Sequence, residues 1–593
     1  MRTAVILHSV SDARHCVENK FFEGNVLFST HSSVDVYLKE KHGLDCKCLS
    51  GFLPTEELIS MREKCAKTVG GLLKNLDSGL SPSLNKKFNL KLDYFTPLYF
   101  FYCGLQLLGY ATFVDCVKRA ADVHKPEKIL FYDYRFNKFL NVSTSVSDLV
   151  PLFFAGIRTD IIEIPADKDI PGPGRGMKRI MNALRRLKGR NFRFILKGIA
   201  VAVHKYGFKR FRDDRKTVLI SEPLYELEFL VNSLNKYNIL YYDFREEGFL
   251  GFGTQRLTYD VNLDLRSKGF IKDDTDPFVK LLLENIEEDF AANGNRYLNA
   301  VRSIEMINMK HPVSLGIWGV SPSWRSRAMI FEYLSSKGIK VVGSQHGCLY
   351  GEALSPWNVE TDFNRCDHFI SWGFTREDLE RVYPSIKIKA EILPLGKTKI
   401  VKYEKASRKI DFLFPITVSI SMFESGMDRI SPDMVVERQI TLLEHLNSLK
   451  SRDIYIKPFI DSGYLNCSAW SVFERLNNLK VVDNVSLTDF LLEYSPKAVL
   501  IEVPSQPLFD VLPLDAEIFL MDDPLNPYEA KALEELKRRV HYCEDTAEAI
   551  AKIDLFMKGE LEKKRDDTFY KHYMYKEGTE GKILGLIDNL VNR

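Results

Sequence analysis

The sequence predicts an α/β protein in which two Rossmann-like domains face each other across a cleft, with helical additions in the N-terminal half. Three observations lead to this prediction. Short β-branched or aromatic runs alternate with amphipathic helical segments, which is the pattern of parallel sheets covered by helices. The 593-residue chain is longer than one hydrophobic core usually organises. Its 45% hydrophobic and 27% charged residues are typical of globular proteins.

The first domain is expected to span residues 1–400. The N-terminal sequence MRTAVILHSV lacks the features of a signal peptide and is interpreted as a first strand. Further strands are expected at 25–31, 128–134 and 160–164. A helix is predicted at 32–42, because a serine at its start can cap it and Gly43 can end it. The loop PGPGRG opens a section, about 171–310, that is interpreted as a helical insertion, in which the segments 217–224 and 239–244 alternate with helices.

Two segments of this half bear on membrane contact. Residues 94–114 carry no charge and are long enough to span a bilayer, but Pro97, Gln106 and many aromatic residues favour a buried or interfacial helix. The basic stretch 178–216 fits either anionic lipid headgroups and acidic glycans or an ordinary solvated helix face. Together they predict peripheral contact with the inner face of a membrane.

The clearest strand–helix–strand unit covers residues 314–345. A strand at 314–320 precedes a helix at 321–338, and a strand at 339–345 follows. The charged segment 397–409 is interpreted as a linker to a second α/β domain, about 405–560. Its strands are expected at 411–418, 453–458, 479–482, 498–503 and 517–521. The tail, 561–593, is predicted to be helical and able to cross back to the first domain.

Several function classes are disfavoured by the sequence. A net charge of +2 does not suit nucleic-acid binding. Ten cysteines without a CxxC pair predict free thiols in the cytoplasm and no metal site. Glycine-rich dinucleotide and complete P-loop motifs are missing, as are the metalloprotease, hydrolase and kinase motifs. We therefore expect no cofactor.

Candidate catalytic residues lie in the segment SQHGCLYGEALSPWNVETDFNRCDHFISWG, 344–373. His346 follows a predicted strand, where parallel sheets bind ligands, and can accept a proton or contact a phosphate or sugar oxygen. Glu352 and Asp367 supply carboxylates nearby. A structural histidine at 346, and a cap or turn aspartate at 367, are the alternatives.

Candidate donor-binding residues lie at the ends of other predicted strands. Gln345 and Gly347 flank His346, and Arg325 lies at a helix start where it can bind an anion, or is surface charge. Ser421 and Glu424 lie in the loop 417–426, whose hydroxyls and amides suit phosphate oxygens. Lys457, Ser505 and Gln506 follow two later strands. Because the carboxyl ends of parallel strands share one edge, these loops would face one crevice.

The motif residues resemble those of a known group. Gln345-His346-Gly347, Tyr350-Gly351-Glu352 and the run CDHFISWG at 366–373 resemble bacterial surface-carbohydrate transferases of capsule and O-antigen biosynthesis. The Lys457-Pro458 and Pro504-Ser505 loops look like signatures of GT-B glycosyltransferases related to Kdo transferases. The chain departs from that pattern at Cys348, Phe459 and Gln506.

The resemblance implies metal-independent transfer of a sugar, such as a CMP-linked acidic sugar, from a nucleotide-activated donor to a surface polysaccharide or lipid-linked acceptor. The second domain would hold the donor through Ser421, Glu424, Lys457, Ser505 and Gln506, and His346 would act as base or contact the transferred group. Arg325 would hold an acidic donor or acceptor. Two alternatives remain: transfer of a polyol phosphate, and a non-catalytic polysaccharide-assembly protein.

Overall fold

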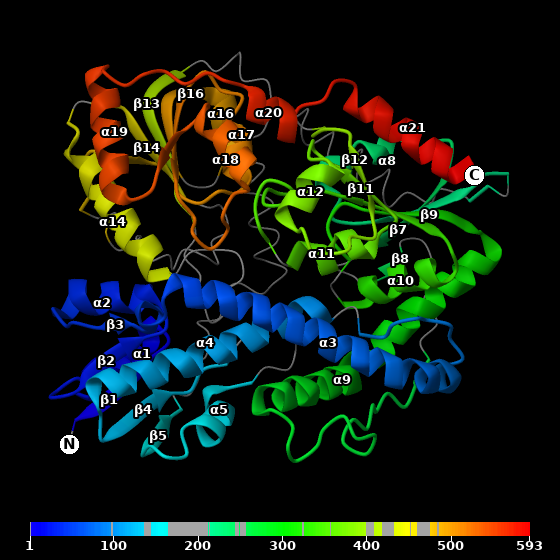
Figure 1. Cartoon of the computed structure of the whole chain (residues 1–593), viewed down its shortest axis with the longest axis horizontal. Coiled ribbons are helices and arrows are strands. Elements are labelled where there is room, and N and C mark those ends of the chain that lie inside the picture. The colour runs from blue at the N-terminus through cyan, green and yellow to red at the C-terminus, as the bar shows by residue number, and fades with distance from the viewer. Residues whose placement is uncertain are drawn as a thin grey trace, which may run out of the picture.

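The structure, a computed structural model, describes residues 2–96, 99–135, 144–163, 211–212, 214–243, 248–249, 257–322, 325–355, 357–398, 408–417, 432–450, 452–458, 472, 475–482 and 485–592. In this part of the chain three mainly parallel sheets are found (Figure 1). We call the corresponding units the N-terminal domain (2–163), the middle domain (214–398) and the C-terminal domain (408–566). The predicted α/β class with Rossmann-like sheets is confirmed.

The N-terminal domain is built on a five-stranded parallel sheet of order β3-β2-β1-β4-β5. Its strands are β1 (Thr3–Leu7), β2 (Val26–Ser29), β3 (Lys47–Cys48), β4 (Lys128–Tyr132) and β5 (Thr159–Ile162). Its helices are α1 (Val10–Glu18), α2 (Ser32–His42), η1 (Leu49–Phe52), α3 (Thr55–Phe88), α4 (Phe100–His124) and α5 (Val146–Phe153). The predicted helix 32–42 is confirmed, with His31 as its cap and Gly43 at φ 64° ending it.

Helix α4 contains most of the uncharged segment 94–114, which is long enough to span a membrane. It is long and apolar enough to cross a bilayer, but 83% of its most apolar 18-residue window is buried inside the protein. It packs against α3 and against the long helix α9 (Pro277–Lys310). Packing against helices of both the N-terminal and the middle domain therefore accounts for its apolar composition.

The middle domain contains a seven-stranded sheet of order β12-β11-β10-β9-β6-β7-β8. Its strands are β6 (Thr217–Ser221), β7 (Asn238–Asp243), β8 (Gly248–Phe249), β9 (Val313–Trp318), β10 (Lys340–Ser344), β11 (His368–Ser371) and β12 (Glu391–Pro394). Besides α9, its helices are η3 (Tyr225–Leu227), α8 (Leu230–Ser233), α10 (Arg325–Ser336), α11 (Trp357–Thr361), η4 (Phe363–Arg365) and α12 (Arg376–Val382). Only β8 runs antiparallel to its neighbour.

Two sequence expectations change here. The region 1–400 holds two separate sheets where one domain was expected. The section 171–310 is not an insertion: β6 and β7, which fall on the expected segments 217–224 and 239–244, are wholly buried, and β6 pairs with β9 inside the middle sheet. Strand propensity reports burial and side-chain shape, and it does not tell which neighbour a strand joins. The basic stretch 178–216 lies almost entirely outside the described residues.

The C-terminal domain has a six-stranded parallel sheet of order β15-β14-β13-β16-β17-β18. Its strands are β13 (Arg408–Pro415), β14 (Ile454–Lys457), β15 (Lys480–Val481), β16 (Tyr494–Ile501), β17 (Glu517–Met521) and β18 (His541–Cys543). Its helices are α14 (Pro432–Ser448), α16 (Leu487–Glu493), α17 (Gln506–Val511), α18 (Ala530–Lys537) and α19 (Thr546–Lys558). Five of these strands occur where the sequence predicts them, and β18 is additional.

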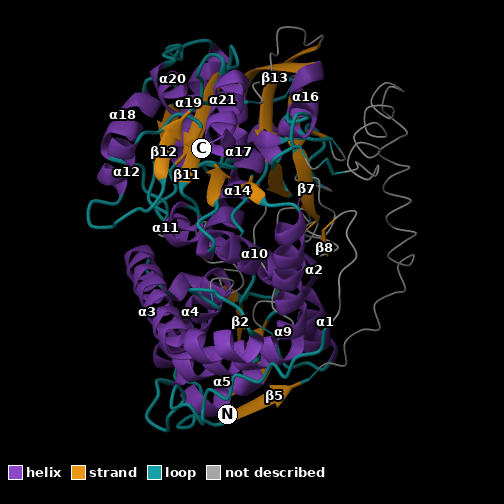
Figure 2. Cartoon of the chain, turned by 90° about the vertical axis from the view of Figure 1, so that its right-hand side faces the viewer, coloured by secondary structure: helices purple, strands orange, loops and turns teal. Residues whose placement is uncertain are grey.

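The tail returns to the middle domain. Helix α20 (Thr568–Tyr573) packs against α18, and α21 (Thr579–Asn592) lies along the middle sheet in both views (Figures 1 and 2). Ile583, Ile587 and Val591 of α21 join the apolar cluster formed by β6 and β9. The C-terminal segment thus covers one face of a sheet that precedes it by about 200 residues.

Both later sheets contain a point where the strand order reverses. In the middle sheet the chain proceeds outward from β6 to β7 on one side and from β9 to β12 on the other. In the C-terminal sheet the corresponding reversal lies between β13 and β16. Open α/β sheets bind ligands at the carboxyl ends of strands at such points. The segments that follow β6, β9, β13 and β16 are therefore the places to examine for a site.

Candidate functional site

His346 lies just beyond the carboxyl end of β10, the strand beside β9. Its side chain is 29% exposed, so the ring reaches solvent. The ring of Tyr225, from the segment after β6, stacks roughly parallel to it with centroids 6.5 Å apart. The residue predicted to carry the chemistry thus lies next to the reversal point of the middle sheet, beside an aromatic ring that is itself 51% exposed.

A hydrogen-bonded chain runs from His346 into the domain. The Tyr350 hydroxyl lies 2.8 Å from Nδ1 of His346 and donates to Oδ1 of Asp362 at 3.2 Å. The Thr361 hydroxyl donates to the other Asp362 oxygen at 2.6 Å. The Tyr350 hydroxyl has a single hydrogen, which it donates in the hydrogen bond to the carboxylate. Nδ1 of His346 must therefore be the donor to the tyrosine oxygen. This tautomer leaves Nε2 with a lone pair that can accept a proton.

The titration properties of this chain follow from burial. Burial lowers the pKa of His346 to about 4, and the positive charge of Arg327 adds to the effect. Burial raises the pKa of the Asp362 carboxyl to about 7. The imidazole is therefore neutral at pH 7 and available as an acceptor. Asp362, 3.9 Å from Nδ1, would stabilise a transient positive charge on the ring.

Gln345 and Gly347, predicted to contact the donor, shape the loop around His346. The side chain of Gln345 is buried; it donates to the Gly347 carbonyl at 2.7 Å and accepts from the Trp372 amide at 2.8 Å. It thereby joins the ends of β10 and β11. A Cβ added to Gly347 would meet no atom within 4 Å, so this glycine leaves open space beside the imidazole.

Glu352, predicted to be catalytic, anchors the same loop. Its buried carboxylate accepts the backbone N–H groups of Leu349, Tyr350 and Gly351, and burial raises its pKa. Leu349 has φ 66°, a backbone conformation that such anchoring can hold. A carboxylate occupied by three amides has little capacity left for proton transfer. The catalytic prediction for Glu352 is replaced by a positioning role.

Two glycines of the motif are explained by packing. A Cβ on Gly351 would lie 2.4 Å from the side chain of Phe374, and a Cβ on Gly373 would lie 2.0 Å from the His572 carbonyl oxygen. The second contact is with α20, the helix through which the tail returns. The Tyr-Gly and Trp-Gly pairs therefore allow segments to pass closely.

Asp367, the third predicted catalytic residue, lies away from His346. Its carboxylate accepts the Val341 amide at 2.9 Å and approaches the Lys340 ammonium at 3.3 Å, so it contacts the amino end of β10. His346 follows the opposite end of that strand. At about 3.3 Å per residue, five residues separate the two ends by roughly 16 Å. Asp367 is thus a structural residue before β11, which agrees with the alternative interpretation as a cap or turn aspartate.

Contacts from the loop after His346, and one beside it, join the middle domain to the C-terminal domain. The Cys348 thiol donates to the Pro504 carbonyl at 3.5 Å, which joins the His346 loop to the segment after β16. Ala353 forms an antiparallel bridge with Tyr528. Nearby, the buried Lys397 ammonium pairs with Asp510 at 3.0 Å above the ring of Trp372. The reversal points of the two sheets therefore meet, as a shared site requires.

The predicted donor residues are partly placed by this arrangement. Ser505 caps α17 without a side-chain cap bond, directly after Pro504. Gln506 donates to Asp510 at 2.8 Å, and the ammonium of Lys457, buried at the end of β14, donates to the Pro458 carbonyl. Arg325 is the first residue of α10, after β9. Ser421 and Glu424 lie outside the described residues.

Asp362 and Tyr225 were missed as site residues. Asp362 lies in a segment with two other acids, and its contact with Tyr350 is the only feature that singles it out. Nothing in the sequence singles out Tyr225, which directly follows the expected segment 217–224. Among the described residues, no group of three His, Cys, Asp or Glu side chains could hold a metal ion.

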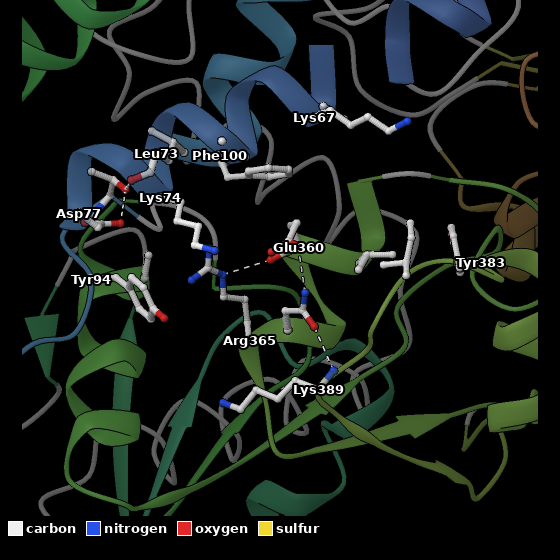
Figure 3. Close-up of a pocket in the computed structure, with 18 of the residues that line it drawn as sticks. Lys67, Leu73, Lys74, Asp77, Tyr94, Phe100, Glu360, Arg365, Tyr383 and Lys389 are labelled. Carbon is white, nitrogen blue, oxygen red and sulfur yellow. Dashed lines mark hydrogen bonds between the residues drawn. The ribbon is translucent and has the colours of Figure 1, made fainter. Parts of the chain in front are cut away.

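A cavity of about 1130 Å³ lies elsewhere, between α3 and the helices α10 to α12. Figure 3 shows Lys74 of α3 facing Arg365 across it, with Tyr94 and Lys389 nearby. His346 is not among its lining residues. No local pattern in the sequence indicates this cavity, because its walls come from two domains that the sequence predicts as one.

The fold is similar to several solved structures at low identity. The UDP-GlcNAc 2-epimerase of Methanocaldococcus jannaschii shares 11% identity over 63% of this chain and 99% of that chain, with a TM-score of 0.37. MurG of Acinetobacter baumannii shares 11% over 63% and 99%, with a TM-score of 0.35. Sucrose-phosphate synthase of Thermosynechococcus elongatus shares 7% over 63% and 99%, with a TM-score of 0.36.

No protein with a curated description matches the sequence significantly. A family match is found for the part of the chain that contains the His346 loop and the first strands of the C-terminal domain, and it ends before Pro504. Residues 221–493, which include the His346 loop and β13 to β15, match the model of the LIC12162 family transferases.

Proposed function

We propose that the protein is a glycosyltransferase that moves a sugar from a nucleotide-activated donor to a surface glycan or a lipid-linked acceptor. The observation that carries the proposal is the contact between Cys348 and Pro504. It brings His346, with a proton-accepting Nε2, to the carboxyl ends of the C-terminal strands, where the nucleotide would bind. The transferase family match over residues 221–493 supports the same reaction class.

In the proposed reaction the acceptor hydroxyl oxygen bonds to the anomeric carbon of the donor sugar. The bond from that carbon to the phosphate oxygen breaks, and the nucleotide leaves with the bonding electrons. The hydroxyl proton passes to Nε2 of His346, while Asp362 stabilises the imidazolium through its proximity to Nδ1. Ser505 and Lys457 lie at strand ends suited to the donor phosphates.

The test combines nucleotide binding with turnover. Wild type, His346→Ala and a control, His42→Ala, would be titrated with CMP, UDP and GDP by calorimetry and then assayed for nucleotide release from activated sugars. His42 is an exposed histidine of α2, far in sequence from the site. His346→Ala should keep nucleotide affinity and lose turnover by about 10²- to 10⁴-fold, the usual contribution of a general base.

Three outcomes contradict the proposal. Wild-type turnover by His346→Ala would remove the ring from the mechanism. Failure of the wild-type protein to bind any of the three nucleotides would favour an assembly protein without catalysis. A product whose added mass contains phosphorus would show transfer of a polyol phosphate instead of a sugar.

A further inference from the structure

We propose that Tyr225 is the platform on which the acceptor binds, and that the acceptor unit in contact with it is an uncharged sugar ring. The ring of Tyr225 lies nearly parallel to the ring of His346, with an angle of 18° between the planes and centroids 6.5 Å apart. The inference rests on the proposed function and deepens it, because it names a residue and a ligand class for the acceptor side of the same site.

The exposure of the Tyr225 ring is not explained by packing. Leu224 and Leu227, on either side of it, are buried in the apolar cluster of β6 and β9, whereas Tyr225 is 51% exposed and is not part of that cluster. Among the described residues its hydroxyl has no hydrogen-bond partner, and its one ring contact is with His346. Rings 6.5 Å apart are near the far limit of a direct pair, so they cover little of each other. Much of the flat surface of Tyr225 is therefore open to a ligand.

The backbone of Tyr225 is in an unfavourable conformation. Its φ is 43°, in the left-handed region that bulky residues rarely adopt. Glycine adopts this region without the steric cost, so the backbone alone would favour glycine here. Residues held in such conformations cluster at ligand sites, where the surrounding structure fixes them. A tyrosine that is both exposed and strained therefore points to a function for its ring.

A buried arginine fixes the segment that carries Tyr225. The guanidinium of Arg327 on α10 donates to the Glu222 carbonyl at 2.9 Å. It also donates to the carbonyls of Val320 and Ser321, which follow β9. One side chain thus joins the segment after β6 to the segment after β9. Because a buried charged donor without acceptors is costly, these bonds hold the segment firmly.

Two further contacts fix the same segment. A Cβ added to Gly319 would lie 2.3 Å from the Leu224 carbonyl oxygen, so this glycine allows the segment after β6 to pass closely. The Thr398 hydroxyl, after β12, donates to the Glu226 carbonyl. Tyr225 therefore lies between two anchored neighbours, and its ring has a defined position at the carboxyl ends of the middle strands.

The charges around the ring select against an anionic ligand. Residues 222–228 read EPLYELE, with three glutamates and no lysine or arginine. Carboxylates repel an acidic sugar but accept hydrogen bonds from hydroxyl groups. A pyranose ring offers C–H groups on its face, which pack on an aromatic ring, and hydroxyls at its edge. An uncharged sugar matches both the tyrosine and the acids beside it.

The platform lies where the proposed reaction requires the acceptor. A sugar in contact with Tyr225, about 4 Å from its ring, would have hydroxyls beside the neighbouring imidazole of His346. Nε2 of that imidazole is the atom that would take the hydroxyl proton. The nucleotide would bind at the carboxyl ends of the C-terminal strands, so the two substrates would approach each other from different domains.

The test measures sugar binding apart from nucleotide binding. Wild type would be titrated by calorimetry with maltotetraose, mannotetraose and N-acetylchitotetraose, with the acidic tetragalacturonate, and with CMP, UDP and GDP. The variants would be Tyr225→Phe, Tyr225→Ala and Tyr225→Gly. The control would be Tyr94→Ala, since Tyr94 is 48% exposed but belongs to the N-terminal domain and lines the separate cavity.

We expect at least one uncharged tetrasaccharide to bind the wild type, and tetragalacturonate to bind at least tenfold more weakly. Tyr225→Ala and Tyr225→Gly should reduce the affinity for the uncharged sugar at least tenfold, whereas Tyr225→Phe and Tyr94→Ala should retain it. Tyr225→Gly should also melt at a temperature no lower than wild type in differential scanning calorimetry, because glycine relieves the cost of the positive φ.

Four results would overturn the inference: no binding of any uncharged probe, tighter binding of tetragalacturonate, sugar affinity unchanged in Tyr225→Ala, or a lowered melting temperature of Tyr225→Gly. The nucleotide titrations separate this failure from failure of the proposed function. Sugar binding that depends on Tyr225, in a protein that binds no nucleotide, would support the platform and contradict the glycosyltransferase. Nucleotide-sugar turnover with unchanged sugar affinity in Tyr225→Ala would overturn the platform alone.

Discussion

The hydroxyl oxygen of Tyr350 lies 2.8 Å from Nδ1 of His346 and determines which ring nitrogen carries the proton. The Tyr350 hydroxyl donates its hydrogen bond to Asp362, so Nδ1 of His346 carries the imidazole proton. Nε2 is therefore unprotonated. His346, Tyr350 and Asp362 are thus connected by hydrogen bonds, although 16 positions separate the first from the last. The geometry assigns Tyr350 to positioning, since its oxygen contacts the imidazole and the carboxylate and does not reach the cleft.

Replacing Tyr350 with Phe should therefore lower kcat by about tenfold, the value of one hydrogen bond, with little change in KM for the donor. The ring packs among Phe363, Phe369 and Phe374, so phenylalanine preserves the packing. The pH profile of kcat should also change, because the tautomer is no longer fixed. Tyr494→Phe, at a distant ring, is the control, and an unchanged pH profile would contradict the positioning role.

Glu352→Gln should destabilise the protein more than it slows the reaction. The substitution removes negative charge from an oxygen pair that holds three amides, and hydrogen bonds to a charged group contribute about 1.5–3 kcal/mol each. We expect the free energy of unfolding to fall by about 3 kcal/mol in urea denaturation. Glu493→Gln, in an exposed ion pair, should change it by less than about 1 kcal/mol. Loss of activity without loss of stability would return Glu352 to the catalytic role.

Glu332 should make stability depend on pH in a particular direction. Burial raises its folded pKa to about 7 from the usual 4.5, so the folded state binds the proton more tightly than the unfolded state. Its contribution is most favourable below pH 4.5 and is lost as the pH rises toward 7, by about 3 kcal/mol in total.

Glu332→Gln keeps the shape and lacks this titration. At pH 8 the variant should be more stable than wild type, and at pH 4.5 the difference should vanish. Urea denaturation at the two pH values measures it, with Glu287→Gln as the control, since Glu287 is not among the lining residues of the cavity. A variant that is less stable than wild type at pH 8 would show that the carboxylate has a partner in solution.

His572 should also make stability fall as the pH rises, because it is a base whose protonated form is paired in the folded state. The hydrogen bond to Asp378 raises the pKa of His572, and Glu535 on its other nitrogen adds to the effect. The protonated ring therefore stabilises the folded state fully below about pH 6.5, its usual pKa, and this contribution is lost as the pH rises through the raised value. It joins α20 to the middle domain through Asp378 and to α18 through Glu535.

His572→Gln should lower the melting temperature by several degrees at pH 6 and by much less at pH 9. Differential scanning calorimetry at the two pH values checks the effect, with the exposed His42→Gln as the control. A loss of equal size at both pH values would show that the ring contributes packing and no charge.

The sequence predicts strands better than it predicts their partners. His346 was found because a buried run, a glycine and a histidine identify a strand end, and this information is local. Asp367 was misjudged because an acid beside a strand looks the same at either end, and only the register of β10 against β11 shows which end it occupies. The division of residues 1–400 into two sheets depends on pairing β6 with β9 across some 95 residues, which no local pattern encodes.

The cavity depends on the same long-range information. Lys74 and Arg365 are almost 300 positions apart, and each on its own is an ordinary charged residue. The burial of Glu332 is likewise a property of the packed structure. Chemistry that arises between domains is therefore hidden from motif analysis, whereas chemistry at the end of one strand is accessible to it.

The return of α21 to the middle sheet has a consequence for motion. The polypeptide passes between the middle and C-terminal domains twice, once between β12 and β13 and once between α19 and α20. A line through these two connections is an axis about which one domain can rotate relative to the other. The connections restrict this rotation less than any other relative motion of the two domains. Rotation about this axis would change the distance between His346 and Ser505. In the proposed function, the same rotation would admit the donor and release the nucleotide.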